Sequence, residues 1–269
     1  MALFLICLYC INGYSKSGDR MLMFIRFFFM MSLLASTASY GKENVVYFTS
    51  LDWPPYSGVD LPHQGRTIHR ATEIFAAMGY TLKVDFFPWS RAVKLGLAEK
   101  SKYMGYLPEY YDESLTQDCT FSEPIGFSPL GFAQLKSAPV QWQTLDDIAK
   151  LSKVGVVRDY INTKELDEKI ANGDIKGDIA SSDVENIKKL GGKRIPIIVI
   201  DESVLDYWLN HEADLSPLKN KIEFNDRLLE KKNLYLCFKK DEQGKKMLKI
   251  FNEGLNKQQM KSFMRQSVN

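Results

Sequence analysis

The stretch Gly131-Phe-Ala-Gln-Leu-Lys136 separates two halves of the chain that repeat the same pattern of strands and helices. Its apolar and aromatic residues predict a strand. A second run of this kind, Leu234-Tyr-Leu-Cys-Phe-Lys239, comes late in the chain. We interpret both runs as strands that cross between two lobes, an arrangement that leaves a cleft whose walls can hinge closed.

Ahead of residue 131, strands and helices alternate along the chain. We predict a strand at Val45–Thr49, a helix at Thr67–Met78, a strand at Thr81–Phe86, a helix that begins within Pro88–Ala92, and a strand at Tyr103–Leu107. The first helix is indicated by apolar residues at helical spacing and by Gly79 directly after it. Such alternation is typical of a parallel α/β sheet.

The pattern restarts after Asp146-Asp147. We predict a strand at Lys153–Val157, helices at Asn162–Ala171 and Asp183–Leu190, a strand at Ile195–Ile200 and a helix at Ser203–Asn210. A last amphipathic helix, Gly244–Met264, is too short to form a third lobe, so we expect it to pack on the first. The predicted organisation is a discontinuous lobe I at 41–132 and 238–269, a continuous lobe II at 136–233, and crossings at 132–136 and 233–238.

Residues 1–38 are predicted to be a leader with a cleavable signal peptide. A short cationic segment that ends at Arg26 precedes an apolar run, and Ser36-Thr-Ala38 supplies the small residues of a cleavage site. The apolar run is too short to span a hydrocarbon core of about 30 Å. The first twenty or so residues fit the pattern poorly, so we expect Met21 or Met23 to be the true start and the mature protein to be periplasmic.

Charge and cysteine content narrow the class of protein further. Outside the leader the numbers of basic and acidic residues are equal. The mature chain therefore lacks the excess of positive charge that is typical of nucleic-acid-binding proteins.

Cys119 and Cys237 are the cysteines beyond the leader, and the sequence leaves open whether they form a disulfide or are two separate buried thiols. Lipid attachment at Cys10 is a weaker alternative to the cleaved signal. No metal-ligand spacing is present, and we expect no metal and no cofactor.

Six short motifs, taken in order, carry a resemblance to a known family. They are Trp53-Pro-Pro-Tyr56, Pro88-Trp-Ser-Arg-Ala92, Phe121-Ser-Glu-Pro-Ile125, Val154-Gly-Val-Val-Arg-Asp-Tyr160, Ile200-Asp-Glu202, and Leu236-Cys-Phe-Lys-Lys240 followed by Phe251-Asn252. Over residues 44–265 the chain resembles the periplasmic amino-acid-type solute-binding proteins of ABC transporters, the extracellular solute-binding protein family 3. The resemblance implies a type II two-lobed α/β fold, a monomer that delivers a small-molecule ligand to a membrane permease, and no catalysis.

The match to the ligand contacts of this family is uneven. Members that bind amino acids carry an arginine ahead of the Phe-Ser-x-Pro motif, where it holds the α-carboxylate, but Tyr110–Thr116 contains none. The pattern after the first loop is altered to Gly65-Arg-Thr-Ile-His69. Asp201 stands where an acidic residue usually takes the α-ammonium group. If the aromatic and acidic strip Glu109–Asp112 faces the cleft, we expect a ligand more cationic or more extended than a neutral amino acid.

Residues just after strands are the default ligand contacts in parallel α/β lobes. On this basis, with the resemblance, we predict a binding site made of Trp53, Tyr56, Trp89, Arg91, Tyr106, Tyr110, Arg158, Tyr160 and Asp201. The tryptophans and tyrosines offer flat walls that suit a carbon skeleton or a cation, although each can equally be core packing.

The charged candidates each have two interpretations. Arg158 can clamp a carboxylate with two parallel hydrogen bonds, or form a surface salt bridge. Arg91 can replace the missing arginine, or be a solvated helix residue. Asp201 can pair with a cationic ligand group, or cap the helix that begins near Ser203.

Two other functions are compatible with the same scaffold. One is a sensor that works with a separate receptor or kinase. The other is an enzyme of the dehydratase kind, which requires a general acid or base in the cleft. The histidines are His63, His69 and His211, and the sequence has no catalytic triad order and no phosphate loop. We therefore expect a binding protein and no enzyme, with Glu202 or Asp201 left open as a base.

Overall fold

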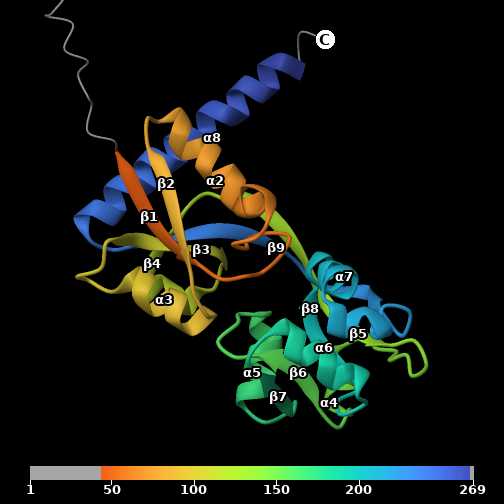
Figure 1. Cartoon of the computed structure of the whole chain (residues 1–269). Helices are drawn as coiled ribbons and strands as arrows, with labels where there is room; N and C mark the ends of the chain where they lie inside the picture. The colour runs from red at the N-terminus through yellow and green to blue at the C-terminus, as the bar shows by residue number, and fades with distance from the viewer. Residues whose placement is uncertain (1–43, 267–269) are drawn as a thin grey trace, which may run out of the picture. The chain divides into compact units, whose positions relative to one another are not determined.

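The computed structural model describes residues 44–266, and the predicted leader, signal peptide and start site lie outside the described residues. Within this range the strands form one sheet in the order β2-β1-β3-β9-β5-β8-β6-β7, with β4 paired to β9 (Figure 1). The strands are β1 (Val45–Ser50), β2 (Thr81–Phe86), β3 (Tyr103–Tyr110), β4 (Cys119–Phe121), β5 (Gly126–Leu135), β6 (Val154–Val157), β7 (Gly177–Ala180), β8 (Ile197–Asp201) and β9 (Ile222–Lys239). None of the helices in the described part is long and apolar enough to cross a membrane.

Helices and short 3-10 turns connect these strands. They are η1 (Pro62–Gln64), α2 (Arg66–Ala77), α3 (Trp89–Leu97), η2 (Glu113–Gln117), α4 (Leu145–Ala149), α5 (Lys164–Ala171), α6 (Asp183–Gly191), α7 (Glu202–His211), η3 (Ala213–Leu218) and α8 (Glu242–Gln266). Every predicted strand and helix is present. The elements absent from the sequence interpretation are β4, β7, α4 and the 3-10 turns, all of which are too short to display a periodic pattern.

Three predicted strands are clearly longer than expected, and one of them is β3, which ends at Tyr110 instead of Leu107. β5 begins at Gly126 instead of Gly131, and β9 begins at Ile222 instead of Leu234. The early part of β9 is rich in charged and amide residues, which conceals the strand signal. It is held in place by β5, whose register pairs Gly126 with Leu234 and Leu135 with Ile222.

The first lobe is built on β1, which pairs in parallel with β2 and β3. Its core joins this sheet to α2 and α8 through Phe48, Phe75 and Phe251. The ring of Phe48 lies 5.9 Å from that of Phe75, and Phe251 lies 5.1 Å from Phe75. The last helix thus packs beside α2, because the two helices share an apolar face.

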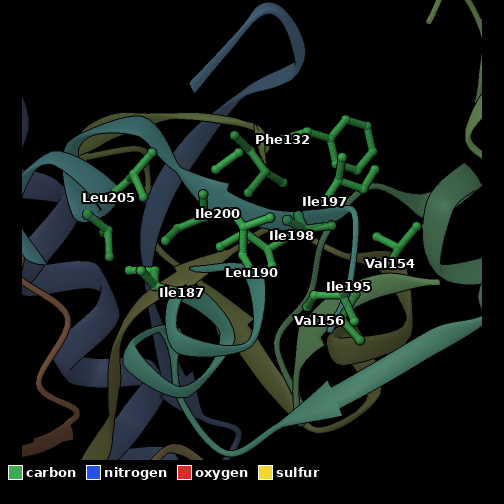
Figure 2. Packing of buried hydrophobic residues seen from close by; sticks show 14 of the residues in the cluster. Phe132, Val154, Val156, Ile187, Leu190, Ile195, Ile197, Ile198, Ile200 and Leu205 are labelled. Carbon is green, nitrogen blue, oxygen red and sulfur yellow. The ribbon is translucent and has the colours of Figure 1, made fainter. Parts of the chain in front are cut away.

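The second lobe is built on β6, which pairs in parallel with β7 and β8. Figure 2 shows the apolar side chains that pack between this sheet and α6 and α7, among them Val154, Ile187 and Ile198. All four residues of β6 and all five of β8 are buried. Burial on both faces explains why these strands are continuous apolar runs.

The long strands β5 and β9 belong to both lobes. Beyond Leu130, β5 pairs with β8 of the second lobe, whereas the end of β9 pairs with β3 and β4 of the first. A disulfide joins Cys119 on β4 to Cys237 on β9, with their Cα atoms 5.6 Å apart. The structure thus settles the pairing that the sequence left open, and it is consistent with an oxidising compartment.

Candidate functional site

A small cavity is lined by residues that lie within or just after strands of both lobes. The lining consists of Leu51, Trp53, Trp89, Pro108, Glu109, Tyr110, Tyr160, Ile161 and Leu234. Its volume is about 30 Å³, which is room for one or two water molecules. A ligand the size of an amino acid therefore requires the walls to move apart.

Trp53 forms one wall, in the turn that follows β1, and Tyr56 of the same turn supports it from behind. Their rings are stacked with centroids 4.4 Å apart, and the edge of Tyr110 meets Trp53 at 5.9 Å. A backbone hydrogen bond from Trp53 N to the carbonyl of Ser57, 2.8 Å, closes the turn. The guanidinium of Arg66 lies 3.9 Å above the ring of Tyr56, so this ring already has a cation on one side.

Trp89, the first residue of α3, forms the opposite wall. Its ring meets the edges of Tyr106 at 5.4 Å and Tyr160 at 6.2 Å. The indole Nε1–H donates to the carbonyl of Asp159 at 3.0 Å, and the hydroxyl of Ser90 donates to the Asp159 carboxylate. Asp159 follows β6 with a φ of 61°, so the start of α3 in the first lobe contacts a left-handed turn in the second.

Glu109 contributes the only carboxylate among the residues that line the cavity. Its two oxygens accept hydrogen bonds from the Tyr110 backbone N–H at 2.8 Å and from the Tyr106 hydroxyl at 3.2 Å. Burial raises the pKa of the Glu109 carboxyl to about 8, a rise that the nearby Lys232 opposes and Asp112 reinforces. The group is therefore largely protonated at neutral pH.

Asp183 lies behind the cavity at the start of α6. Burial, and then the charge of Asp201, raise the pKa of Asp183 to about 7, while a hydrogen bond from the Tyr160 hydroxyl at 3.4 Å opposes the rise. Burial and the Asp183 carboxylate raise the pKa of Tyr160 in turn. This tyrosine thus links a cavity wall to a second buried acid.

Asp201 ends β8 and caps α7. One of its oxygens accepts from the Val204 backbone N–H at 2.9 Å. The other accepts from the Tyr56 hydroxyl at 2.7 Å and from the hydroxyl of Ser128. Burial raises the pKa of the Asp201 carboxyl despite these donors. The capping interpretation of Asp201 is therefore confirmed, and its role toward a ligand stays a prediction.

The predicted site residues fall into three groups. Trp53, Trp89, Tyr110 and Tyr160 line the cavity, Tyr56 and Tyr106 contact that lining from behind, and Asp201 is hydrogen-bonded to Tyr56. Arg91 and Arg158 are exposed. Arg91 lies over the ring of Phe87 at 5.1 Å. The guanidinium of Arg158 has no ion-pair partner in residues 44–266.

Sequence reasoning did not assign several residues that the structure brings to this region, among them the lining residues Leu51, Ile161 and Leu234. Pro108 and Glu109 line the cavity, Ser128 bridges Tyr110 and Asp201, and Asp159 meets Trp89. The acidic strip at the end of β3 was the available signal for Glu109. Ser128 had no signal, because its partners lie on other elements.

The three histidines lie away from the cavity. The rings of His63 and His69 stack on each other at 4.3 Å, and that of His211 stacks on Tyr207 at 4.2 Å. Glu202 is exposed on the first turn of α7. The ionisable groups in the cavity lining are thus the carboxyl of Glu109 and the phenols of Tyr110 and Tyr160.

No protein-family model matches the chain, and no curated protein sequence is significantly similar to it. Several solved structures are similar to this chain. A histidine kinase sensor domain with similarity to periplasmic binding proteins matches with a TM-score of 0.68 at 18% identity, over 84% of this chain and 95% of that one. The GluR0 ligand-binding core from Nostoc punctiforme, in complex with L-glutamate, matches with a TM-score of 0.63 at 17% identity, over 81% of this chain and 94% of that one.

A third similar structure is holo ArgBP from T. maritima, with a TM-score of 0.64 at 16% identity, over 80% of this chain and 91% of that one. At these identities the likeness concerns the fold. The chain has the two-lobed α/β fold of periplasmic amino-acid-binding proteins, as predicted. Several of the similar structures are ligand-binding proteins, and a small-molecule ligand suits this fold.

Proposed function

We propose that the chain is a periplasmic solute-binding protein that captures a small polar or amino-acid-like ligand between its lobes and delivers it to the permease of an ABC transporter. The observation that carries the proposal is the cavity, to which both lobes contribute aromatic walls. Trp89 of the first lobe and Tyr160 of the second meet edge to face at 6.2 Å. A guest held there would touch both lobes at once and favour their closure.

The moving parts in this proposal are the lobes predicted from the sequence, with β5 and β9 as the flexible connection. Two backbone strands that pass side by side can bend while each lobe stays rigid. The turn at Asp159 already contacts Trp89 and Ser90 in the described structure, so opening of the lobes would separate these residues. We propose that the protein is exported and acts as a monomer.

A sensor component is the second candidate. The likeness to a histidine kinase sensor domain favours it, and ligand capture would be the same in both cases. The partner distinguishes the two functions. A permease that binds the liganded form supports transport, whereas a receptor or kinase that binds it supports sensing.

A thermal-shift screen of the protein against amino acids, polyamines, small peptides and organic acids tests the binding function. A bound ligand stabilises the folded state by mass action, by about 2.7 kcal/mol at one hundred times its Kd. We expect at least one class to raise the Tm. Failure of every class to do so would contradict the proposal.

The position of binding is tested with a matched pair of variants. Trp89→Ala removes a cavity wall, so we expect it to abolish the shift. Tyr111→Ala removes an aromatic ring that is 50% exposed and lies outside the cavity, and it should leave the shift unchanged. Equal effects of the two variants would mean that the ligand binds outside this cavity.

A further inference from the structure

We infer that the ligand of this cavity is a small organic cation without a carboxylate group. This inference rests on the proposed function and specifies the chemistry of the ligand. Three features of the described residues support it: the aromatic lining, the buried acids, and the positions of the basic side chains.

The lining is an aromatic enclosure drawn from both lobes. Trp53 and Tyr110 contribute rings that meet at 5.9 Å, and Trp89 and Tyr160 contribute a second pair at 6.2 Å. Aromatic faces attract cations within about 6 Å of the ring centroid, and the attraction is greatest where water is excluded. An ammonium or guanidinium group between the two pairs would contact faces or edges of all four rings once the walls have separated.

Two buried acids lie at this enclosure, and neither forms an ion pair within residues 44–266. Glu109 is 6% exposed and is held by donors from Tyr106 and Tyr110, both neutral. Asp183 is 5% exposed and is met by the Tyr160 hydroxyl. Keeping a charged carboxylate in such a place is costly unless a positive charge compensates it. A cationic ligand would supply that charge.

None of the basic side chains in the described part of the chain lines the cavity, and Arg158, which forms no ion pair there, is exposed. Lys232 lies 5.4 Å from the Tyr110 ring and 3.7 Å from Glu230, and it does not line the cavity. Arg66 lies over Tyr56 and donates to Ser203 at 3.3 Å. A ligand carboxylate would meet Glu109 and find no arginine fork, so an α-amino acid gains less here than its decarboxylated counterpart.

Isothermal titration calorimetry with matched pairs of ligands isolates the carboxylate. The pairs are arginine with agmatine, lysine with cadaverine, and ornithine with putrescine, and choline serves as a cation of fixed charge. We expect the amine of at least one pair, or choline, to bind at least about tenfold more tightly than the amino acids, a difference of about 1.4 kcal/mol.

The variants Glu109→Gln and Glu113→Gln make a matched test of the charge. Glu113 is an exposed acid of the same lobe, outside the cavity. We expect Glu109→Gln to weaken binding of the cation at least about tenfold, and Glu113→Gln to leave it unchanged. The amide is nearly the same size as the carboxyl, and a Tm at least equal to that of the wild type will show that the variant is folded.

Proton release gives a second readout that does not depend on a variant. Binding of choline should drive the proton from Glu109, with Asp183 as a smaller contributor. The phenols of Tyr106, Tyr110 and Tyr160 stay neutral in this range because burial raises their pKa values. At pH 7 we therefore expect the binding heat to vary with the ionisation enthalpy of the buffer, and the affinity to rise toward pH 8.

The outcomes separate this inference from the proposed function. Tighter binding of the amino acid in every pair, no binding by any of the cations, or no effect of Glu109→Gln on their affinity would overturn the inference and leave ligand capture standing. If no compound of any class in the thermal-shift screen binds, both fail.

Discussion

The hydroxyl of Tyr56 donates to a carboxylate oxygen of Asp201 at 2.7 Å, across 145 residues of sequence. This bond joins the turn after β1 to the end of β8, and Ser128 on β5 donates to the same oxygen. The capping carboxylate of α7 is therefore also a meeting point of the two lobes. We therefore expect the loss of either donor to affect the stability of both lobes.

Tyr56→Phe is expected to destabilise the protein by about 1–3 kcal/mol, because it removes a donor from a buried carboxylate. Urea unfolding followed by circular dichroism measures the loss. Tyr80→Phe is the control, since the Tyr80 hydroxyl has no hydrogen-bond partner within residues 44–266. A loss of stability no greater than that of the control would mean that the Tyr56 bond contributes nothing.

Gly65 fixes the turn that carries Trp53 and Tyr56. Its φ of 98° and ψ of 159° lie in a region that only glycine adopts readily. A Cβ atom there would lie 2.6 Å from the Tyr56 carbonyl oxygen. We expect Gly65→Ala to cost about 1–3 kcal/mol more than Gly79→Ala, where φ is also positive but no atom lies within 4 Å.

Chemical denaturation of both variants, with tryptophan fluorescence as the probe, checks this difference. Tryptophan emission also reports whether the wall at Trp53 has moved. Equal costs at the two glycines would show that the turn gives way to the added methyl group without strain.

Reduction of the disulfide should lower the free energy of unfolding by up to about 5 kcal/mol, because the bond closes a loop of 118 residues. Both sulfurs are buried in the first lobe, so reductant should act mainly during unfolding. Urea melts with and without dithiothreitol measure the effect. The double variant Cys119→Ser, Cys237→Ser should be insensitive to reductant, and a wild type equally insensitive would contradict the prediction.

Glu109 should make the protein less stable as the pH rises. An unfolded glutamate loses its proton near pH 4.5, whereas the folded one keeps it until about pH 8. Between these values the folded state binds more protons, so the free energy of unfolding falls with rising pH, by at most about 5 kcal/mol from this group. Above pH 8 its contribution is constant.

Urea melts of the wild type and of Glu109→Gln from pH 5 to pH 9 test this sign. The stability of the variant relative to the wild type should grow across the window and then level off. For the exposed acid, Glu113→Gln, the difference should stay flat. A relative stability of Glu109→Gln that does not change with pH would mean that Glu109 ionises normally.

The sequence by itself determined the longer helices and strands and their order along the chain. Apolar residues at period 3.6 mark α2 and α8, and continuous apolar runs mark β6 and β8, because these patterns follow from local geometry and burial. It also brought Trp53, Trp89, Tyr110 and Tyr160 into the predicted site, since residues that follow strands gather at one edge of a sheet.

Only the tertiary structure decided which distant groups meet. The Cys119–Cys237 bond, the full length of β9, and the bridge from Tyr110 through Ser128 to Asp201 depend on strand register and lobe contact. The protonation state of the site also depends on the tertiary structure. The pKa of Glu109 is set by burial and by neighbours on several elements, and a carboxyl acquires that environment only when the chain is folded.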